Sequence, residues 1–224
     1  MPMKRLKKLA FAVGWLLLGS YALLVLSLVY LRFLPPATTG VQLQRRVEAI
    51  AAGESYDKAY DFVGSGGISD HVEHAVVAAE DTRFYEHHGF DWKEIGKARA
   101  EAAREGTAPR GASTITQQLV KNLYFTTHRS YLRKALEIAI TPAAELVLGK
   151  DRILELYLNV IEWGPGVYGV EAAAQYHYSR SAADLSRDQA ARLAAVVPDP
   201  LNRSPSRMSA YSRIILGRMR QMGW

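Results

Sequence analysis

Cysteine, internal repeats and strand-like patterns are all missing from this chain of 224 residues. Without cysteine the protein has no disulfide bond and no thiol nucleophile, which is compatible with an oxidising compartment without identifying one. No segment repeats with a period of about 20–50 residues, and no long stretch alternates apolar and polar residues as a large β-sheet would. The patterns that remain have helical spacing, so the sequence predicts a mainly α fold.

Charged side chains are absent from Leu9 to Leu31, a run long enough to span the ~30 Å hydrocarbon core of a membrane. Only Arg32 follows the run closely, whereas four basic residues precede it: Lys4, Arg5, Lys7 and Lys8. The positive-inside rule therefore predicts a cytoplasmic segment 1–8, a transmembrane helix 9–31 and an exported remainder. The alternative is a cleaved signal peptide, but its apolar core is usually only about 7–15 residues long and precedes a small-x-small site.

The formal net charge of +6 is unevenly distributed along the chain. Residues 1–31 hold four basic and no acidic side chains, which leaves 24 basic and 22 acidic side chains in the exported part. Such a nearly neutral domain lacks the concentrated basic face that binding to nucleic acid requires. The sequence therefore predicts no nucleic-acid partner.

Residues 32–67 contain several glycines and are interpreted as a juxtamembrane connector with a short helix near Gln42–Ala52. Residues 68–224 are predicted to form one helical domain. Its first helix is expected to begin at Asp70, which would cap it with Glu73 reaching back. Pro142 lies inside a helical pattern and is expected to break or kink that helix near residues 138–141. The other expected helices are Trp92–Glu105, Thr114–Tyr124, Tyr131–Leu148, Arg152–Ile161, Val170–Tyr176, Arg187–Val197 and Arg207–Gln221.

The run from Gly111 to Asn122 combines hydroxyl, amide and basic side chains at the start of a helix. Thr114 and Gln117 form a Ser/Thr-x-x-Gln capping box. The free N–H groups of a helix start, together with Lys121 two turns later, would suit a phosphate group. An ordinary capped helix without a ligand is the alternative interpretation.

Glu80 lies on the apolar stripe of the first domain helix, four residues after Val76 and eight after Val72. Partial desolvation and the negative end of the helix dipole would both raise the pKa of a carboxyl group there. A raised pKa suits a general base that takes a proton from a sugar hydroxyl. From these residues alone, a helix-end glutamate paired with Arg83 is an equally good interpretation.

Five ordered motifs between about Ile68 and Pro205 resemble those of the peptidoglycan glycosyltransferases, lysozyme-like enzymes that polymerise lipid II. The most specific of these motifs is Gly111-x-Ser-Thr-Ile-Thr-Gln-Gln-x-x-Lys121-Asn122. The other four are Glu80-Asp-x-x-Phe-Tyr-x-His-x-Gly-x-Asp91, Arg133-Lys-x-x-Glu137, Lys150-x-x-Ile-Leu-Glu-x-Tyr-Leu-Asn159 and Gly169-Val-x-Ala-Ala-Ala174. With its length and single anchor, the chain is similar in particular to the monofunctional biosynthetic transglycosylases of Gram-negative type, in glycosyltransferase family 51.

The resemblance implies a lysozyme-like helical domain and assigns roles to several residues. Glu80 matches the catalytic base, and Lys121 and Arg129 match residues that contact the pyrophosphate of the donor. Glu137 matches a second essential carboxylate, for which three roles stay open: proton donor, metal ligand, or organiser of the basic cluster. Arg133 would bind the same diphosphate or pair with Glu137 one turn on.

Neutral side chains of the second motif are expected to bind sugar hydroxyls or phosphate. These substrate-binding candidates are Ser113, Thr114, Gln117, Gln118 and Asn122. Alternatively, Gln118 and Asn122 simply face solvent on the polar side of their helix.

Asp81 is the candidate ligand for a divalent cation, Mg²⁺ or Mn²⁺, although an aspartate there could equally cap the next turn. Four histidines lie nearby in the sequence, but there is no His-Glu-x-x-His motif, so a zinc site is not favoured. His87 is expected to order the loop that leads to Gly89 and Asp91.

The resemblance thus implies inverting glycosyl transfer from lipid II to a growing glycan strand, in the bacterial inner membrane with the catalytic domain in the periplasm. A cell-wall synthesis or division complex is the protein assembly it allows. A glycan-cleaving hydrolase or lytic transglycosylase is the main alternative, because two glutamates in such a fold could also cleave glycosidic bonds. A non-catalytic scaffold is disfavoured by the intact glutamate motifs. All expected chemistry follows Ile68, so removal of residues 1–34 is expected to leave an active domain.

Overall fold

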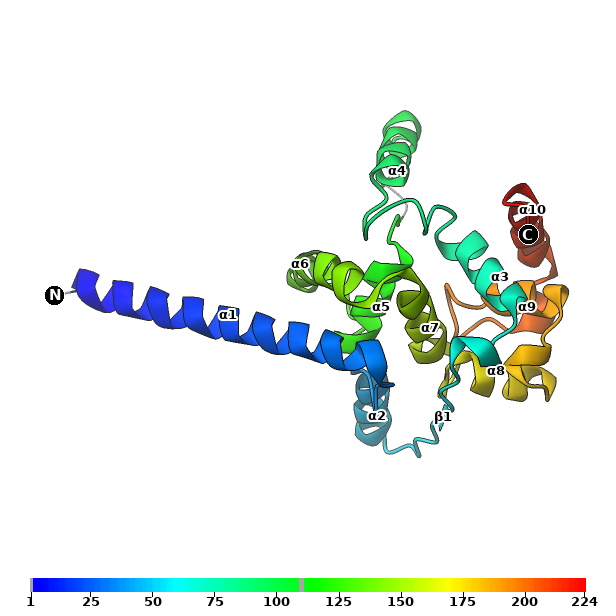
Figure 1. Cartoon of the computed structure of the whole chain (residues 1–224), viewed down its shortest axis with the longest axis horizontal. Helices are drawn as coiled ribbons and strands as arrows, with labels where there is room; N and C mark the ends of the chain where they lie inside the picture. Colours follow the sequence, from blue (N-terminus) through cyan, green and yellow to red (C-terminus); the bar gives the residue numbers. More distant parts are fainter. Residues whose placement is uncertain (1, 109–110) are drawn as a thin grey trace.

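The computed structural model describes residues 2–108 and 111–224, and helices predominate in these residues (Figure 1). The α-helices are α1 (Pro2–Phe33), α2 (Gly40–Ala52), α3 (Asp70–Glu80), α4 (Trp92–Glu105), α5 (Ile115–Tyr124), α6 (Tyr131–Leu148), α7 (Lys150–Val160), α8 (Val170–Tyr178), α9 (Arg187–Ala194) and α10 (Ser209–Gln221). Short 3₁₀ helices cover Ser65–Gly67, Ala182–Asp184 and Pro205–Arg207. The mainly α expectation is confirmed.

A small sheet holds one end of the domain together. Its strands are β1 (Ala59–Tyr60), β2 (Glu162–Gly164) and β3 (Val167–Tyr168), in the order β1-β3-β2. β3 pairs parallel with β1 and antiparallel with β2. The segment predicted as a connector therefore contributes a strand to the domain, and its helix α2 packs against α5.

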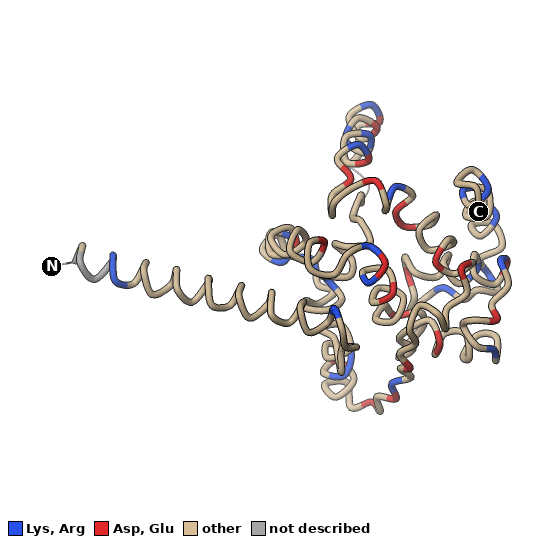
Figure 2. Tube along the Cα trace, in the orientation of Figure 1, with Lys and Arg blue, Asp and Glu red and all other residues tan. Residues whose placement is uncertain are grey.

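Helix α1 projects from the domain as a long rod (Figure 1). Within the described part of the chain, Lys7–Phe33 is the one helix long and apolar enough to cross a membrane. Figure 2 shows a long uncharged length of α1 between basic residues near its start and the domain. Its last turns pack against α6, and Leu28 and Leu31 are 0% and 5% exposed.

Polar contacts also fasten the end of α1 to the domain. The Ser27 and Tyr124 hydroxyls lie 2.8 Å apart. The Arg152 guanidinium donates to the carbonyl oxygens of Leu31 and Leu34, at 2.9 and 3.0 Å. These bonds satisfy C-terminal carbonyls that would otherwise lack a partner. The anchor is thus built into the core rather than joined to it by a loose tether.

Two groups of helices position the functional residues. Helix α5 packs between α6 and α7, and α3 packs against α9 and α10. The largest side chains of the shared core are fully buried and include Trp163, Tyr157 and Phe84. The amphipathic spacing read from the sequence is what aligns these apolar faces.

Two local predictions were wrong. Helix α6 runs from Tyr131 to Leu148 with Pro142 inside it, so the expected break is absent. Pro142 lies on the exposed side of the helix, while Ile140 and Ala144 on the other side are buried in the core and hold the helix in place. Helix α3 is capped by Ser69 rather than Asp70: the Ser69 side chain accepts from the His71 N–H. Ser69 has the extended backbone that an N-cap requires.

Candidate active site

Glu80 is the last residue of α3 and is half-buried. Burial raises the pKa of its carboxyl group, while a hydrogen bond from Gln118 and the charge of Lys121 oppose that rise. Arg218 of α10 donates to the carbonyl oxygens of Ala78 and Ala79 at 3.1 and 3.3 Å, so it neutralises this end of α3. The raised pKa expected from the apolar stripe is confirmed.

The alternative pairing of Glu80 with Arg83 is wrong for the part of the chain that the structure describes. Arg83 instead forms ion pairs with Glu86 and Asp91, at 2.7 and 2.9 Å. The Arg83 guanidinium therefore binds carboxylates of the loop after α3. Glu80 instead contacts Gln118 of the second motif.

Gln118 is the side chain that holds Glu80. Its Nε2 donates to Glu80 Oε2 at 2.8 Å, and its Oε1 accepts from the Tyr157 hydroxyl at 2.8 Å. Asn122 is buried and donates to the Gln118 backbone carbonyl at 2.8 Å. Neither amide therefore belongs to a solvated polar face, and that alternative was wrong.

The start of α5 is fixed by the capping box predicted from the sequence. Thr114 accepts from the Gln117 N–H, and the Gln117 side chain accepts from the Thr114 N–H. The Thr114 hydroxyl also donates to the Gly89 carbonyl at 2.7 Å, which joins the first motif to the second. Ser113, just before the cap, is exposed and accepts from Lys134 at 3.1 Å.

Glu137 is 2% exposed and lies among cations. Arg133 donates to its carboxylate from one turn earlier, as the spacing predicted, and Lys134 Nζ lies 3.3 Å from it. A buried carboxylate with two cationic partners is compensated in charge, and it fixes both partners in place.

A pocket of about 670 Å³ opens above this ion pair. Its walls carry the predicted site residues Gln117, Gln118, Lys121, Arg129, Arg133, Glu137 and Ser113, together with Lys134. Burial lowers the pKa of Lys121, and the carboxylates of Glu137 and Glu80 oppose that shift. Among the described residues, neither Lys121 nor Arg129 has a carboxylate within ion-pair distance. This cationic pocket can therefore take a ligand with concentrated negative charge.

A second pocket, of about 550 Å³, lies beside the first and contains Glu80. Asp81, Thr114 and Arg218 also line it, and Ser113 borders both pockets. A carboxylate with a raised pKa thus faces one pocket while cations face its neighbour. This arrangement suits a transfer reaction between two bound molecules, one of which carries an anionic leaving group.

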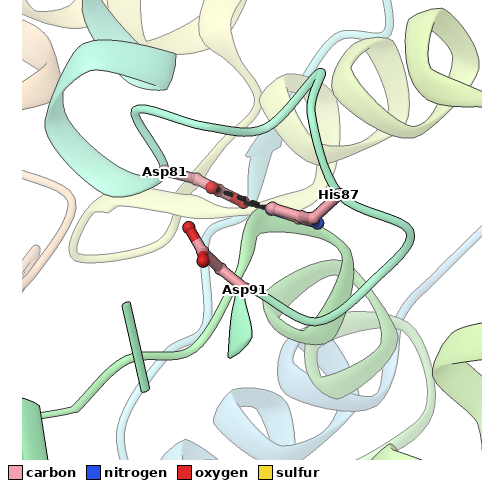
Figure 3. A group of neighbouring side chains, drawn as sticks. All are labelled: Asp81, His87 and Asp91. Atoms are coloured by element: carbon pink, nitrogen blue, oxygen red, sulfur yellow. Dashed lines mark hydrogen bonds and ion pairs between the residues drawn. The ribbon is translucent and has the colours of Figure 1, made fainter. Parts of the chain in front are cut away.

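Asp81, His87 and Asp91 meet in the loop between α3 and α4, with one potential ligand atom from each within 4.8 Å of the others (Figure 3). His87 Nε2 lies 3.0 Å from both Asp81 oxygens, and the Ile115 N–H donates to Asp81 Oδ2 at 3.1 Å. Asp91 accepts from Arg83 and from the Glu94 N–H. In the described structure His87 Nδ1 is buried without a partner, and Figure 3 shows it facing away from the carboxylates.

These contacts explain the three side chains as ties within the loop, and His87 orders it as expected. A cation held here would have to replace the hydrogen bond between His87 and Asp81 and compete with the Arg83 guanidinium at Asp91, so the donor set fits a metal ion poorly. The divalent cation stays a prediction, and no chemical step below depends on it.

Sequence reasoning missed two residues beside Glu80. Tyr157 belongs to the fourth motif, but nothing in the sequence indicated that its hydroxyl reaches Gln118. Arg218 lies in the last helix, outside the five motifs, and no sequence signal connected it with α3.

Comparison with known proteins places these residues in a family. A family model described as Transglycosylase matches residues 46–220. The chain belongs to the transglycosylase family. It is 48% identical to a biosynthetic peptidoglycan transglycosylase of Pseudomonas putida (strain W619), over 92% of this chain and 85% of that protein. Proteins of the same name from Chromohalobacter salexigens and Pseudomonas syringae pv. syringae are 44% and 43% identical, covering 92% and 97% of this chain and 90% and 92% of theirs.

Membership of the transglycosylase family confirms the resemblance on which the motif assignments depend. The match begins inside the segment predicted as a connector, in agreement with the packing of α2 and β1 on the domain.

Proposed function

We propose that the protein polymerises lipid II into linear β(1→4) glycan strands of peptidoglycan, with inversion at the reacting carbon and release of undecaprenyl pyrophosphate. The observation that carries this proposal is the pair of adjoining pockets, one lined by the Glu80 carboxylate and the other by basic side chains. The similarity to proteins named biosynthetic peptidoglycan transglycosylase supports the choice of substrate.

The pocket beside Glu80 receives the acceptor. Glu80 removes the proton from the 4-hydroxyl of the GlcNAc of lipid II, and that oxygen attacks C1 of the MurNAc at the reducing end of the growing strand. The bond from C1 to the phosphate oxygen breaks, so an α-linked donor becomes a β-linked product. The proton remains on Glu80, and the electron pair leaves with the diphosphate.

The cationic pocket receives the donor diphosphate. Negative charge on this group grows as the C1–O bond breaks, and cations fixed beforehand stabilise the transition state more than the ground state. Lys121 supplies a point charge, whereas Arg129 and Arg133 supply planar guanidinium groups that can hold two phosphate oxygens. Gln117 and Ser113 line the same wall and are placed to bind sugar or phosphate oxygens.

Of the three roles left open for Glu137, its surroundings favour organiser of the basic cluster. The carboxylate is 2% exposed and engaged by Arg133 and Lys134, so it aims these cations at the pocket.

A glycan-cleaving enzyme is the alternative, and the cationic pocket argues against it. Cleavage of finished glycan produces no diphosphate, so Lys121, Arg129 and Arg133 would have no developing charge to stabilise. Two carboxylates alone would not distinguish the two reactions.

The proposal also includes the location of the protein. It lies in the inner membrane, with its N-terminus in the cytoplasm and its domain in the periplasm. Helix α1 is long and apolar enough to span, and basic residues precede its apolar run. The exposed residues of α6, which packs against α1, are apolar: Tyr131, Leu132, Ala135, Leu136, Ile138, Ala139, Pro142 and Leu146. This face would rest on the bilayer that holds the lipid-linked substrate.

The decisive experiment supplies purified full-length protein with labelled lipid II and then treats any polymer with a muramidase. The proposal expects a muramidase-sensitive polymer. Cleavage of preformed glycan without any polymerisation of lipid II would overturn it.

A further inference from the structure

Glu80, Gln118 and Tyr157 form a chain of hydrogen bonds across three helices. The Tyr157 hydroxyl of α7 donates to Gln118 Oε1 of α5 at 2.8 Å, and Gln118 Nε2 donates to Glu80 Oε2 of α3 at 2.8 Å. Gln118 Nε2 also lies 3.5 Å from the Ser113 carbonyl. Each polar atom of the Gln118 side chain is therefore committed to a particular neighbour.

Tyr157 cannot touch a substrate, because its side chain is fully buried. Its hydroxyl reaches the site only through Gln118. We propose that Tyr157 is a positioning residue for the transfer reaction, which holds the Gln118 amide in the one orientation that presents N–H rather than C=O to Glu80. This inference rests on the proposed role of Glu80 as the base.

The two orientations of the amide differ in their effect on a base. With Nε2 toward Glu80, Gln118 donates a charge-assisted hydrogen bond to the ionised carboxylate and aims it. With the amide turned over, Oε1 would face the carboxylate, and two acceptors would repel each other. Glu80 and the Ser113 carbonyl therefore favour Nε2 on their side of the amide, and a donor to Oε1 on the other side strengthens that preference.

The Tyr157 hydroxyl is that donor. A buried phenol keeps its proton, since burial raises the pKa of Tyr157 well above its usual value. A protonated hydroxyl beside an amide oxygen acts as a hydrogen-bond donor. If the amide turned over, that hydrogen bond would be lost: the amide N–H would face the phenol, and the amide carbonyl would face the Glu80 carboxylate. Tyr157 of the fourth motif thus influences Glu80 of the first motif through Gln118 of the second motif.

The test is a double-mutant cycle on the full-length protein in detergent, with lipid II polymerisation as the readout. Tyr157→Phe removes one buried oxygen, and Gln118→Met removes the amide at similar side-chain length. Each change is expected to lower kcat by roughly 10- to 100-fold with little change in KM, the upper limit being the loss caused by a misplacement of about 1 Å. The double variant is expected to be no slower than Gln118→Met alone, because both changes break the same chain of hydrogen bonds to Glu80.

Tyr124→Phe is the matched control. Tyr124 lies on α5 and also has one hydroxyl contact, with Ser27, but it is not part of either pocket. The Tyr124→Phe variant is expected to keep native kcat although it loses a similar hydrogen bond. A general loss of packing would lower kcat in both tyrosine variants, whereas loss of positioning would lower kcat in Tyr157→Phe alone.

Two results would overturn the inference: a native kcat for Tyr157→Phe or for Gln118→Met, or a double variant whose loss equals the product of the single losses. If Tyr157→Phe fails to fold, a native kcat for Gln118→Met would still overturn the inference. Failure of the proposed function looks different, since Glu80→Gln would then retain polymerisation. In a Glu80→Gln protein that has lost its activity, adding Tyr157→Phe is expected to change nothing further.

Discussion

Glu80 destabilises the fold at neutral pH because burial desolvates its charge by more than Gln118 and Lys121 compensate. Glu80→Gln is nearly isosteric and removes that charge. We expect polymerisation to fall by about 10²–10⁴-fold, the usual loss of a general base, and thermal stability at neutral pH to rise. Glu86→Gln, which alters an exposed carboxylate nearby, is the control. A well-folded Glu80→Gln protein with near-native turnover would remove Glu80 from the mechanism.

The raised pKa of Glu80 also predicts how activity and stability depend on pH. A base must be ionised, so kcat/KM is expected to fall with decreasing pH at a value above the ordinary 4.5 of a glutamate. For a carboxyl group whose pKa is higher when folded, stability declines as pH rises from the unfolded pKa to the folded one. Glu80→Gln should therefore gain thermal stability over the native protein at neutral pH and gain less at acidic pH. An equal difference at both pH values would contradict this.

Lys121 and Arg129 are free to bind a ligand within the described structure. Lys121→Ala and Arg129→Ala are each expected to lower kcat/KM for lipid II by about 10- to 150-fold, which corresponds to the ~1.5–3 kcal/mol of a hydrogen bond to a charged group. Melting temperatures should barely change. Arg192→Ala, which breaks a surface pair with Asp188, is the control for loss of a cation. Unfolding of either pocket variant would assign that residue a structural role instead.

At the scale of the element, the start of α5 depends on Thr114. The Thr114 hydroxyl caps the helix and also donates to the Gly89 carbonyl, so it supports both the second motif and the loop of the first. Thr114→Ala is expected to reduce the free energy of unfolding by about 1–2 kcal/mol, as measured by chemical denaturation. Thr114→Ser retains the hydroxyl and should lose much less. Equal losses in the two variants would mean that the methyl group, rather than the cap, carries the stability.

At the scale of the whole molecule, the end of α1 belongs to the core, which changes the expectation for truncation. Deleting residues 1–34 removes Leu28 and Leu31, each contributing about 1.5–3 kcal/mol on full burial, together with the carbonyl partners of Arg152. We now expect that deletion to destabilise the domain, as measured by its melting temperature in detergent. This replaces the sequence-based expectation that residues 1–34 are dispensable for an active domain.

Deleting residues 2–20 separates anchoring from folding, because it spares the buried turns of α1. This shorter deletion should retain native activity on lipid II in detergent and lose efficiency on lipid II in liposomes, where the anchor raises the effective concentration of enzyme near its substrate. Equal activity of the truncated and full-length proteins in liposomes would show that α1 contributes to folding alone.

Local spacing is enough to determine much of this protein. The capping box at Thr114 and the Arg133–Glu137 pair each involve residues within about one turn of each other, and the apolar run of α1 is continuous in the sequence. All three occur in the structure as predicted. Such features need no knowledge of the fold, because helix geometry alone brings residues i and i+3 or i+4 together. The ordered motifs likewise identified the family.

The tertiary structure decided which partners these residues meet. Gln118 bonds to Glu80 and Tyr157 across 38 and 39 residues of sequence, and Arg218 reaches α3 across 139 and 140. Helix α6 continues through Pro142, and the end of α1 is buried against α6. Contacts of this kind depend on how whole helices pack, which no pattern of three or four residues encodes.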